Sequence, residues 1–229
     1  MRDRGRRIAP ASAFWRPGLR FSAASSNAQA AIIARLIVVS GPSGAGKGTL
    51  ISQILPRFHD LVLSVSTTTR PLRVGEQEGV EYRYVAREEF LRRVEHGDFL
   101  EWAEYGGNLY GTPAAAVWDM VRQGSDVILE IELQGARQVM SRVPESVVVF
   151  IAPPSLEELE SRLRQRDTET EEAIRRRMDH ARDEMDALAR SAAGEEQEFD
   201  YVIVNDDVDA AVEDLRAAIE EIRATDTER

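Results

Sequence analysis

The sequence predicts an α/β fold in which helices cover both faces of a parallel sheet. Apolar runs typical of buried parallel strands lie at 37–39, 126–132, 147–151 and 201–204, and helical sequence separates them. Residues 79–112 instead form short alternating segments broken by glycines, which is typical of a small, mainly antiparallel lobe. With 229 residues, 43% of them hydrophobic, the chain can bury one core with small appended lobes.

A glycine-rich segment, GPSGAGKGT, follows the first of these strands and opens a helix. This order is typical of a phosphate-binding loop, because backbone N–H groups and the positive end of the helix dipole converge on one anion. Lys47 is the only lysine among 29 basic residues, and a compact ammonium can reach phosphates that a planar guanidinium cannot. A glycine turn beside a chance lysine would lack this framing. We therefore expect a bound nucleotide, contacted by Gly41, Pro42, Ser43, Gly44, Ala45, Gly46, Lys47, Gly48 and Thr49.

Gly48 departs from the general pattern, which has Ser or Thr directly after the lysine. Thr49 cannot substitute for that hydroxyl, because adjacent helical positions point about 100° apart. We therefore predict no protein ligand set for a metal at this point and expect Mg²⁺ to be held through water and the nucleotide phosphates.

Composition excludes several classes of function. The chain has no cysteine, which excludes disulfides, thiolate metal sites and cysteine nucleophiles and is consistent with a cytoplasmic protein. It has no apolar run of 18 residues, so we expect no membrane span. The net charge is -11, and beyond residues 1–35 the chain carries 22 basic against 39 acidic residues. Such a body would repel a nucleic-acid backbone.

Residues 1–34 are interpreted as a disordered, arginine-rich extension, because Ala, Ser, Pro and Gly surround the arginines without an apolar period. A targeting peptide, a sequence read from an upstream start codon and a plain flexible tail would share this composition.

The region after the first helix continues with a strand over 61–66 and a loop over 67–76. Arg70 and Arg73 on this loop are candidates for a phosphate clamp, although a solvated loop could carry the same charges. Helices are predicted over 88–96, within the small lobe, and over 113–124, leading back into the sheet, as a closing helix is over 207–223.

Polar residues follow two of the buried strands: Glu130 and Glu132 end one, and Asn205 and Asp206 end another. Ligands of parallel sheets gather at these carboxyl ends. Residues 162–182 hold seven arginines against five acids, which is typical either of an anion site or of a solvated helix pair. Residues 187–198 are small and acidic, so we expect an exposed insertion there.

Several segments together resemble the guanylate kinases, which are P-loop nucleoside monophosphate kinases. The resemblance runs in unbroken order over about residues 36–223. Its motifs are GPSGAGKGTL (41–50), SVSTTTRPLRVGE (64–76), GVEYRYV (79–85), FLEWAEYGGNLYGT (99–112), VILEIELQGA (127–136), FIAPPSLEELESRLRQRDTET (150–170) and YVIVNDD (201–207).

The resemblance implies a P-loop NTPase fold over residues 35–223. It divides the chain into a core of residues 35–65, 113–161 and 183–223, an antiparallel GMP-binding lobe of residues 66–112, and a helical lid of residues 162–182.

The resemblance also implies site residues. The catalytic cations would be Lys47, Arg70, Arg162, Arg166 and Arg177. Asn205 would join the phosphate loop in binding ATP. GMP would be bound through its phosphate by Arg70, Arg73, Tyr82 and Tyr110, and through its base by Ser66, Glu101, Thr112 and Glu132. Two residues depart from the usual pattern: Asp167 replaces a glycine of the lid, and Glu132 replaces an aspartate.

The implied activity is the ATP-dependent phosphorylation of GMP, and of dGMP, to the diphosphate, with Mg²⁺, which recycles guanine nucleotides. Two alternatives remain open at this point. A guanylate-kinase-like domain can serve as a protein-interaction module without catalysis, although such a module has no need of Lys47 and the lid arginines. Adenylate kinases share a GKGT loop, although the segment FLEWAEYGGNLYGT argues against them.

Overall fold

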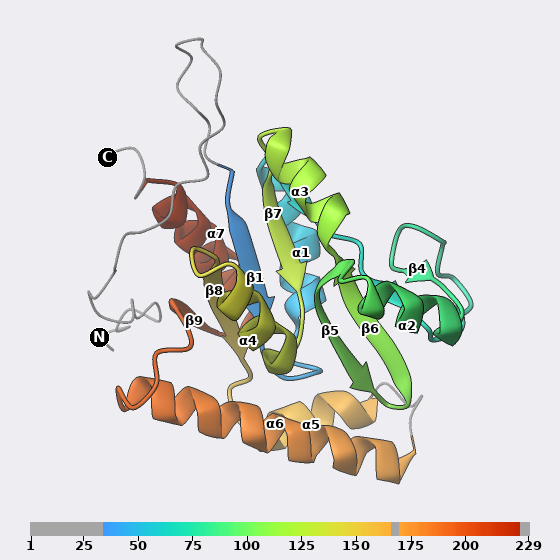
Figure 1. Ribbon diagram of the computed structural model, residues 1–229. Helices are drawn as coiled ribbons and strands as arrows, with labels where there is room; N and C mark the ends of the chain where they lie inside the picture. Colours follow the sequence, from blue (N-terminus) through green and yellow to red (C-terminus); the bar gives the residue numbers. More distant parts are fainter. Residues whose placement is uncertain (1–33, 166–169, 225–229) are drawn as a thin grey trace, which may run out of the picture.

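The computed structural model describes residues 34–165 and 170–224. At its centre lies a five-stranded sheet with the strand order β2-β7-β1-β8-β9 (Figure 1). Every pairing in this sheet is parallel, so the predicted parallel core is confirmed. The strands are β1 (Leu36–Ser40), β2 (Leu61–Leu63), β7 (Asp126–Glu130), β8 (Val147–Ala152) and β9 (Tyr201–Val204).

Helices cover both faces of the sheet, which is why the first four residues of β1 are all apolar. Ile37 and Val39 pack into one hydrophobic cluster, and Leu36 and Val38 pack into another on the opposite face. The first face is covered by α1 (Lys47–Ile54), which ends in the 3-10 turn η1 (Leu55–Arg57), and by α7 (Val208–Ala224). The second face is covered by α3 (Ala114–Arg122), α4 (Leu133–Arg142) and the C-terminal part of α6 (Glu171–Ala192).

A second sheet forms a small lobe beside the core (Figure 1). Its strand order is β4-β3-β6-β5, and it is antiparallel except for the short β3–β4 pair. Helix α2 (Arg87–Glu95) covers this sheet through Phe90, which stacks on Phe99 with ring centroids 4.5 Å apart. The strands are β3 (Thr67–Thr68), β4 (Arg83–Tyr84), β5 (Phe99–Tyr105) and β6 (Asn108–Pro113).

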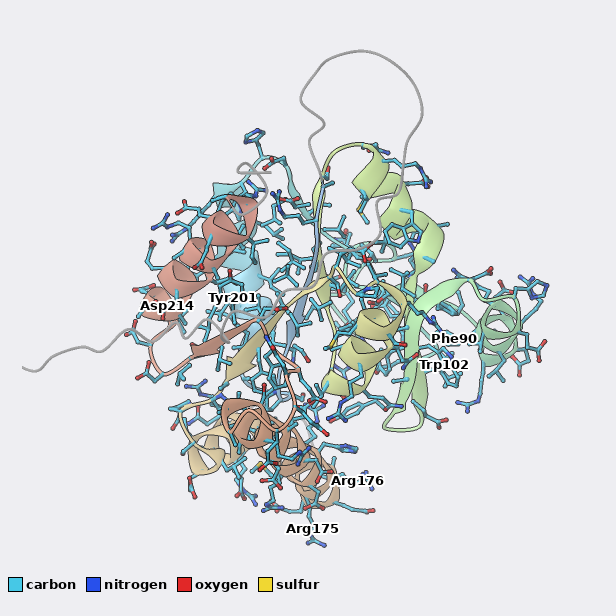
Figure 2. The ribbon with its side chains drawn as sticks, turned by 60° about the vertical axis from the view of Figure 1, so that its left-hand side comes forward. Phe90, Trp102, Arg175, Arg176, Tyr201 and Asp214 are labelled. Atoms are coloured by element: carbon cyan, nitrogen blue, oxygen red, sulfur yellow. The ribbon has the colours of Figure 1, made fainter. Side chains whose placement is uncertain are left out.

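Helices α5 (Leu156–Gln165) and α6 pack against each other at the edge of the core where the parallel strands end (Figure 1). Leu159 and Leu163 of α5 meet Ile174 and Met178 of α6 in a separate hydrophobic cluster. On the outer side of α6, Arg175 and Arg176 are exposed and point away from the body (Figure 2). These two arginines fit the solvated interpretation of the arginine-rich segment.

Two expectations about local structure are wrong. The strand expected over 61–66 ends at Leu63, and the chain then crosses to the small lobe, where β3 pairs with other strands. The exposed insertion expected over 187–198 begins inside α6, which continues without a break to Ala192. Ala187 is buried against the core, so only the residues after the end of α6 form a connecting loop before β9.

The closing helix α7 agrees with its prediction. The Asp207 carboxylate accepts a hydrogen bond from the backbone N–H of Ala210 at 2.9 Å, as an N-cap residue does. The predicted inward face is buried; it consists of Val212, Leu215, Ile219 and Ile222.

Some predicted features lie outside the described residues: the arginine-rich extension up to residue 33, Arg166 and Asp167. Among the helices of the described ranges, none is both long and apolar enough to cross a membrane.

Candidate active site

The glycine-rich loop connects the end of β1 to the start of α1, as predicted. Two of its glycines have no room for a side chain. A Cβ on Gly41 would lie 2.2 Å from the Ile151 carbonyl oxygen, and a Cβ on Gly46 would lie 2.3 Å from Asn205 Nδ2. Both glycines also have positive φ, at 133° and 95°, which disfavours any other residue. The loop can therefore close tightly around an anion only because glycine occupies these positions.

Lys47 is the first residue of α1, and its side chain turns back into the loop. The residue is only 8% exposed. Its ammonium donates hydrogen bonds to the carbonyls of Gly41 and, at 3.2 Å, Pro42. The only lysine of the chain is thus held at the centre of the phosphate loop.

Asn205, which follows β9, fastens the far side of this loop. The residue is 2% exposed, and its Nδ2 donates to the Ala45 carbonyl at 2.7 Å. Its backbone carbonyl accepts a hydrogen bond from Arg162 of α5 at 3.1 Å. Arg177 of α6 donates to the Ser43 hydroxyl at 3.0 Å. Asn205, Arg162 and Arg177, which the resemblance assigned to the same site as Lys47, therefore lie at or beside the loop. Arg166 lies outside the described residues.

On the small lobe, Arg70 is almost fully buried beside a carboxylate. Its guanidinium donates two hydrogen bonds to Glu76, at 3.0 and 2.7 Å, and one to the Pro71 carbonyl at 2.8 Å. Hydrogen bonds from Arg70 lower the pKa of Glu76 to about 2, and the same pairing raises the pKa of Arg70. The ring of Tyr84 also lies against the guanidinium, and its hydroxyl donates to Glu76 at 2.8 Å. Arg70 is thus a fixed, permanently charged group.

The other predicted phosphate ligands surround Arg70 with different exposure. Tyr82 packs on the guanidinium, 5.4 Å from ring centroid to Cζ, and meets Tyr110 edge to face at 5.8 Å. Burial raises the pKa of Tyr82 to about 12, so its hydroxyl stays protonated and can donate. Arg73 is exposed on the loop, where its backbone N–H donates to Glu76 at 2.8 Å.

Glu101 of β5 is a buried carboxylate deep in the lobe. It is 4% exposed, and it accepts a hydrogen bond from the Thr112 hydroxyl at 2.6 Å. Burial raises the pKa of Glu101 to about 7, and the bonds from Thr112 and the charge of Arg142 oppose that rise. A buried carboxylate of this kind is suited to accept hydrogen bonds from a ligand that brings its own donors.

A cleft of about 210 Å³ joins the phosphate loop to the small lobe. Lys47 and Ser43 line it from the loop, and Ser66 and Tyr82 line it from the lobe. Glu130 at the end of β7 and Glu132 just after it also line the cleft. A ligand in this cleft would therefore touch the phosphate loop and two of the residues predicted for the small lobe, Ser66 and Tyr82.

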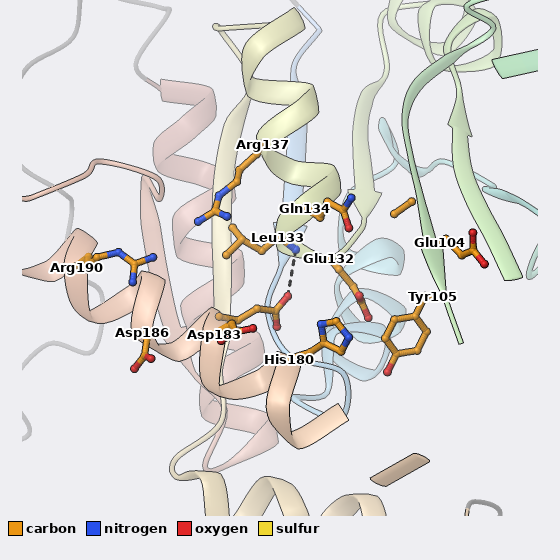
Figure 3. Close-up of a pocket in the computed structure, with 12 residues that line it drawn as sticks. Glu104, Tyr105, Glu132, Leu133, Gln134, Arg137, His180, Asp183, Asp186 and Arg190 are labelled. Carbon is orange, nitrogen blue, oxygen red and sulfur yellow. Dashed lines mark hydrogen bonds between the residues drawn. The ribbon is translucent and has the colours of Figure 1, made fainter. Parts of the chain in front are cut away.

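A second cavity of about 430 Å³ lies between β5, the start of α4 and α6 (Figure 3). Glu132 lines this cavity as well and extends toward Tyr105 and His180. On its wall Glu184, which is 9% exposed, accepts a hydrogen bond from the backbone N–H of Leu133 at 3.2 Å. No role was predicted for Glu184, whose carboxylate satisfies one of the free N–H groups at the start of α4.

Glu130 was expected at the end of a buried strand, but no role was predicted for it. Glu130 is the last residue of β7, and it pairs with Val39 of the neighbouring strand β1. A Cβ on Gly48 would lie 3.5 and 3.6 Å from its two carboxylate oxygens. Desolvation by the surrounding protein raises the pKa of Glu130, and the positive charge of Lys47 opposes this rise. A carboxylate thus approaches the point where other phosphate loops carry a hydroxyl. Strand order was the missing signal, since only the pairing of β7 with β1 brings Glu130 there.

Within the described ranges, no three His, Asp or Glu side chains are grouped so that they could hold a metal ion.

Comparison with known proteins connects this geometry to a family. A family model described as guanylate kinase matches residues 33–222. The chain belongs to the guanylate kinase family. The guanylate kinase of Synechococcus sp. (strain JA-3-3Ab) is 53% identical over 181 residues, which are 79% of this chain and 80% of that protein. The guanylate kinase of Rubrobacter xylanophilus (strain DSM 9941 / JCM 11954 / NBRC 16129 / PRD-1) is 51% identical over 181 residues, covering 79% of this chain and 91% of that protein.

The fold agrees with the same family. The crystal structure of guanylate kinase from Anaplasma phagocytophilum aligns with a TM-score of 0.65 and 34% sequence identity, over 84% of this chain and 86% of that chain. The resemblance first noted in the motifs is therefore confirmed for the family and for the fold. The roles of individual residues in this guanylate kinase family member remain predictions.

Proposed function

We infer that this protein catalyses the ATP-dependent phosphorylation of GMP to GDP, and of dGMP to dGDP. The single observation that carries the inference is the cleft in which Lys47 of the phosphate loop faces Ser66 and Tyr82 of the small lobe. It is supported by relatives about 50% identical that are named guanylate kinases. Phosphoryl transfer depends mainly on positioning two substrates and neutralising charge, and this arrangement serves both needs.

On the donor side, we propose that the loop and Asn205 cradle ATP. The N–H groups at the start of α1 and the ammonium of Lys47 would bind its outer phosphates. Arg177 of α6 already reaches Ser43 of the loop, and Arg162 of α5 reaches Asn205 beside it. From these two helices, the guanidinium groups would add positive charge around the phosphoryl group as it is transferred. Arg166 would join them.

On the acceptor side, we propose that Arg70 holds the phosphate of GMP with Arg73, Tyr82 and Tyr110. The bonds to Glu76 and the Pro71 carbonyl use three of the five N–H donors of Arg70, and the phosphate would take others. Glu76 therefore orients the guanidinium and leaves it N–H donors for the phosphate.

For the base, we propose that the Glu101 carboxylate accepts the N1–H and N2–H₂ donors of guanine. Adenine has an acceptor at N1 and no amino group at C2, so it would leave this buried carboxylate without partners. Such a mismatch rejects the wrong base by roughly 10⁴-fold. Ser66, Thr112 and Glu132 would complete the contacts, and the Thr112 hydroxyl already fixes one oxygen of Glu101.

We propose that Glu130, whose carboxylate lies close to Gly48, would help to hold the Mg²⁺ that accompanies the nucleotide phosphates. The residues present fit the ion, because a carboxylate approaches the position where a loop hydroxyl is missing and carboxylates are preferred Mg²⁺ ligands. The ion would neutralise charge on the phosphate oxygens.

The test is a coupled assay of ADP release on the purified protein, with ATP and each of GMP, dGMP, AMP and UMP. We expect turnover with GMP and dGMP alone. Absence of turnover with GMP, with the fold intact by circular dichroism, would favour a protein-interaction module. Preference for AMP would favour an adenylate-type kinase.

A further inference from the structure

Helix α4 lies along the open edge of the small lobe. β5 is an edge strand, so one side of its backbone has no neighbouring strand. Unpaired N–H and C=O groups on such an edge need other partners when they are covered by protein. Here the partners are side chains of α4.

The amide of Gln138 acts toward Trp102 as a neighbouring strand would. Its Nε2 donates to the Trp102 carbonyl at 2.8 Å, and its Oε1 accepts from the Trp102 N–H at 3.3 Å. One turn further along, a single Nη1 of Arg142 donates to the carbonyls of Phe99 and Leu100, at 2.7 and 2.5 Å. The helix therefore binds the backbone of β5 on both sides of Glu101.

The register of β5 against β6 shifts at the same place, between Phe99 and Glu101. A shift of this kind re-aims the side chain that follows it. The carboxylate of Glu101 then rests on α4 itself, because a Cβ on Gly135 would lie 2.6 Å from Glu101 Oε2. Gly135, Gln138 and Arg142 are spaced i, i+3 and i+7 and so share one face of the helix.

We infer that this face of α4 is a template that positions the Glu101 carboxylate, so that Gln138 and Arg142 determine base specificity without touching the substrate. The inference rests on the proposed function, in which Glu101 binds guanine. Glu132, the second carboxylate proposed to bind guanine, is the N-cap residue of α4, so both carboxylates lie against the same helix. A rigid α4 would hold the two carboxylates in a fixed relation.

The test compares GMP with IMP, which has the N1–H of guanine but lacks its 2-amino group. Gln138→Ala and Arg142→Ala should each lower the ratio of kcat/KM for GMP to that for IMP about tenfold, since a displaced carboxylate loses the second donor. The KM for ATP should change by less than twofold. Arg142→Lys keeps a cationic donor for the two carbonyls and should retain most of the wild-type ratio.

Arg137→Ala is the matched control, because Arg137 lies on the same helix and pairs with Glu198 rather than with β5. It should leave the ratio unchanged. If Gln138→Ala or Arg142→Ala fails to fold, Gln138→Glu takes its place, since it keeps the acceptor for Trp102 N–H and removes the donor to its carbonyl.

Three outcomes separate the claims. If the wild type is active and every variant keeps its ratio of kcat/KM for GMP to that for IMP, the positioning role is overturned and the proposed function stands. Equal losses for GMP, IMP and ATP would assign α4 a purely structural role and would also overturn it. A wild type that does not phosphorylate GMP would overturn the proposed function, and the inference with it.

Discussion

Gly135→Ala probes the contact between α4 and the Glu101 carboxylate with one added methyl group. The new Cβ would lie 2.6 Å from Oε2 and 3.1 Å from Cδ of Glu101, so the carboxylate must retreat by about 0.8 Å to reach ordinary contact. It has little room, because Thr112 holds its other oxygen at 2.6 Å. Misplacing a substrate-binding group by about 1 Å costs on the order of 10²-fold in rate. We expect kcat/KM for GMP to fall by about that factor.

Stability should fall only modestly in this variant. Replacing glycine by alanine inside a helix stabilises the helix by about 1 kcal/mol, whereas overpacking destabilises the fold by about 1–3 kcal/mol. The free energy of unfolding should therefore fall by no more than about 2 kcal/mol. Steady-state assays at varied GMP and ATP, with thermal melting as the fold control, measure both quantities. The KM for ATP should stay at its wild-type value.

A double-mutant cycle with Glu101→Asp tests the cause. Aspartate is one methylene shorter, so it should not meet the alanine Cβ. Gly135→Ala should then cost little more activity in the Glu101→Asp background, and the two losses should be strongly non-additive. Full GMP activity in Gly135→Ala, or additive losses in the cycle, would refute the claim that Glu101 rests on the helix.

Three further predictions concern the phosphate sites and pH. Lys47→Ala and Lys47→Arg should both lower kcat by about 10²-fold or more with an unchanged melting temperature, because a guanidinium cannot replace the ammonium within the loop; an active Lys47→Arg enzyme would contradict this. Arg70→Ala should raise the KM for GMP about tenfold to 10²-fold and leave that for ATP nearly unchanged, whereas equal increases in the two KM values would remove Arg70 from the acceptor site. In the proposed site the ionised form of Glu101 binds guanine, and burial raises its pKa to about 7, so the KM for GMP should be about tenfold higher at pH 6 than at pH 8. GMP's own phosphate also titrates near pH 6, so Glu101→Gln is the control, and the same pH profile in that variant would exclude Glu101 as the titrating group.

Local sequence predicts the phosphate loop well, because a strand, tight glycine turns and a helix start are all encoded by neighbouring residues. Gly41 and Gly46 could be identified as required, but the groups that require them are distant in sequence: Ile151 lies in β8 and Asn205 follows β9. The strands of the parallel sheet can also be predicted, because each is a local run of apolar residues. The order of the strands cannot be predicted in this way, and that order brings Glu130 beside Gly48.

The lobe and the second helix pair show where local patterns fail. β3 and β4 contain two residues each and exist only through pairing, so no periodicity announces them. Residues 187–192 were expected to be exposed because the segment 187–198 is rich in small and acidic residues. Their Ala, Leu and Arg are strong helix formers, however, and extend α6. The bonds from α4 to β5 join residues 36 to 43 positions apart, beyond any local pattern.

The central claim is that a single buried carboxylate makes this enzyme a guanylate kinase. It is tested most directly by the ratio of kcat/KM for GMP to that for AMP, measured on the wild type and on Glu101→Gln. We predict a wild-type ratio of roughly 10⁴ or more, and a fall of at least about 10²-fold in the variant, because an amide accepts only one of the two guanine donors and turns an NH₂ toward the other. An unchanged ratio in Glu101→Gln would mean that another residue reads the base.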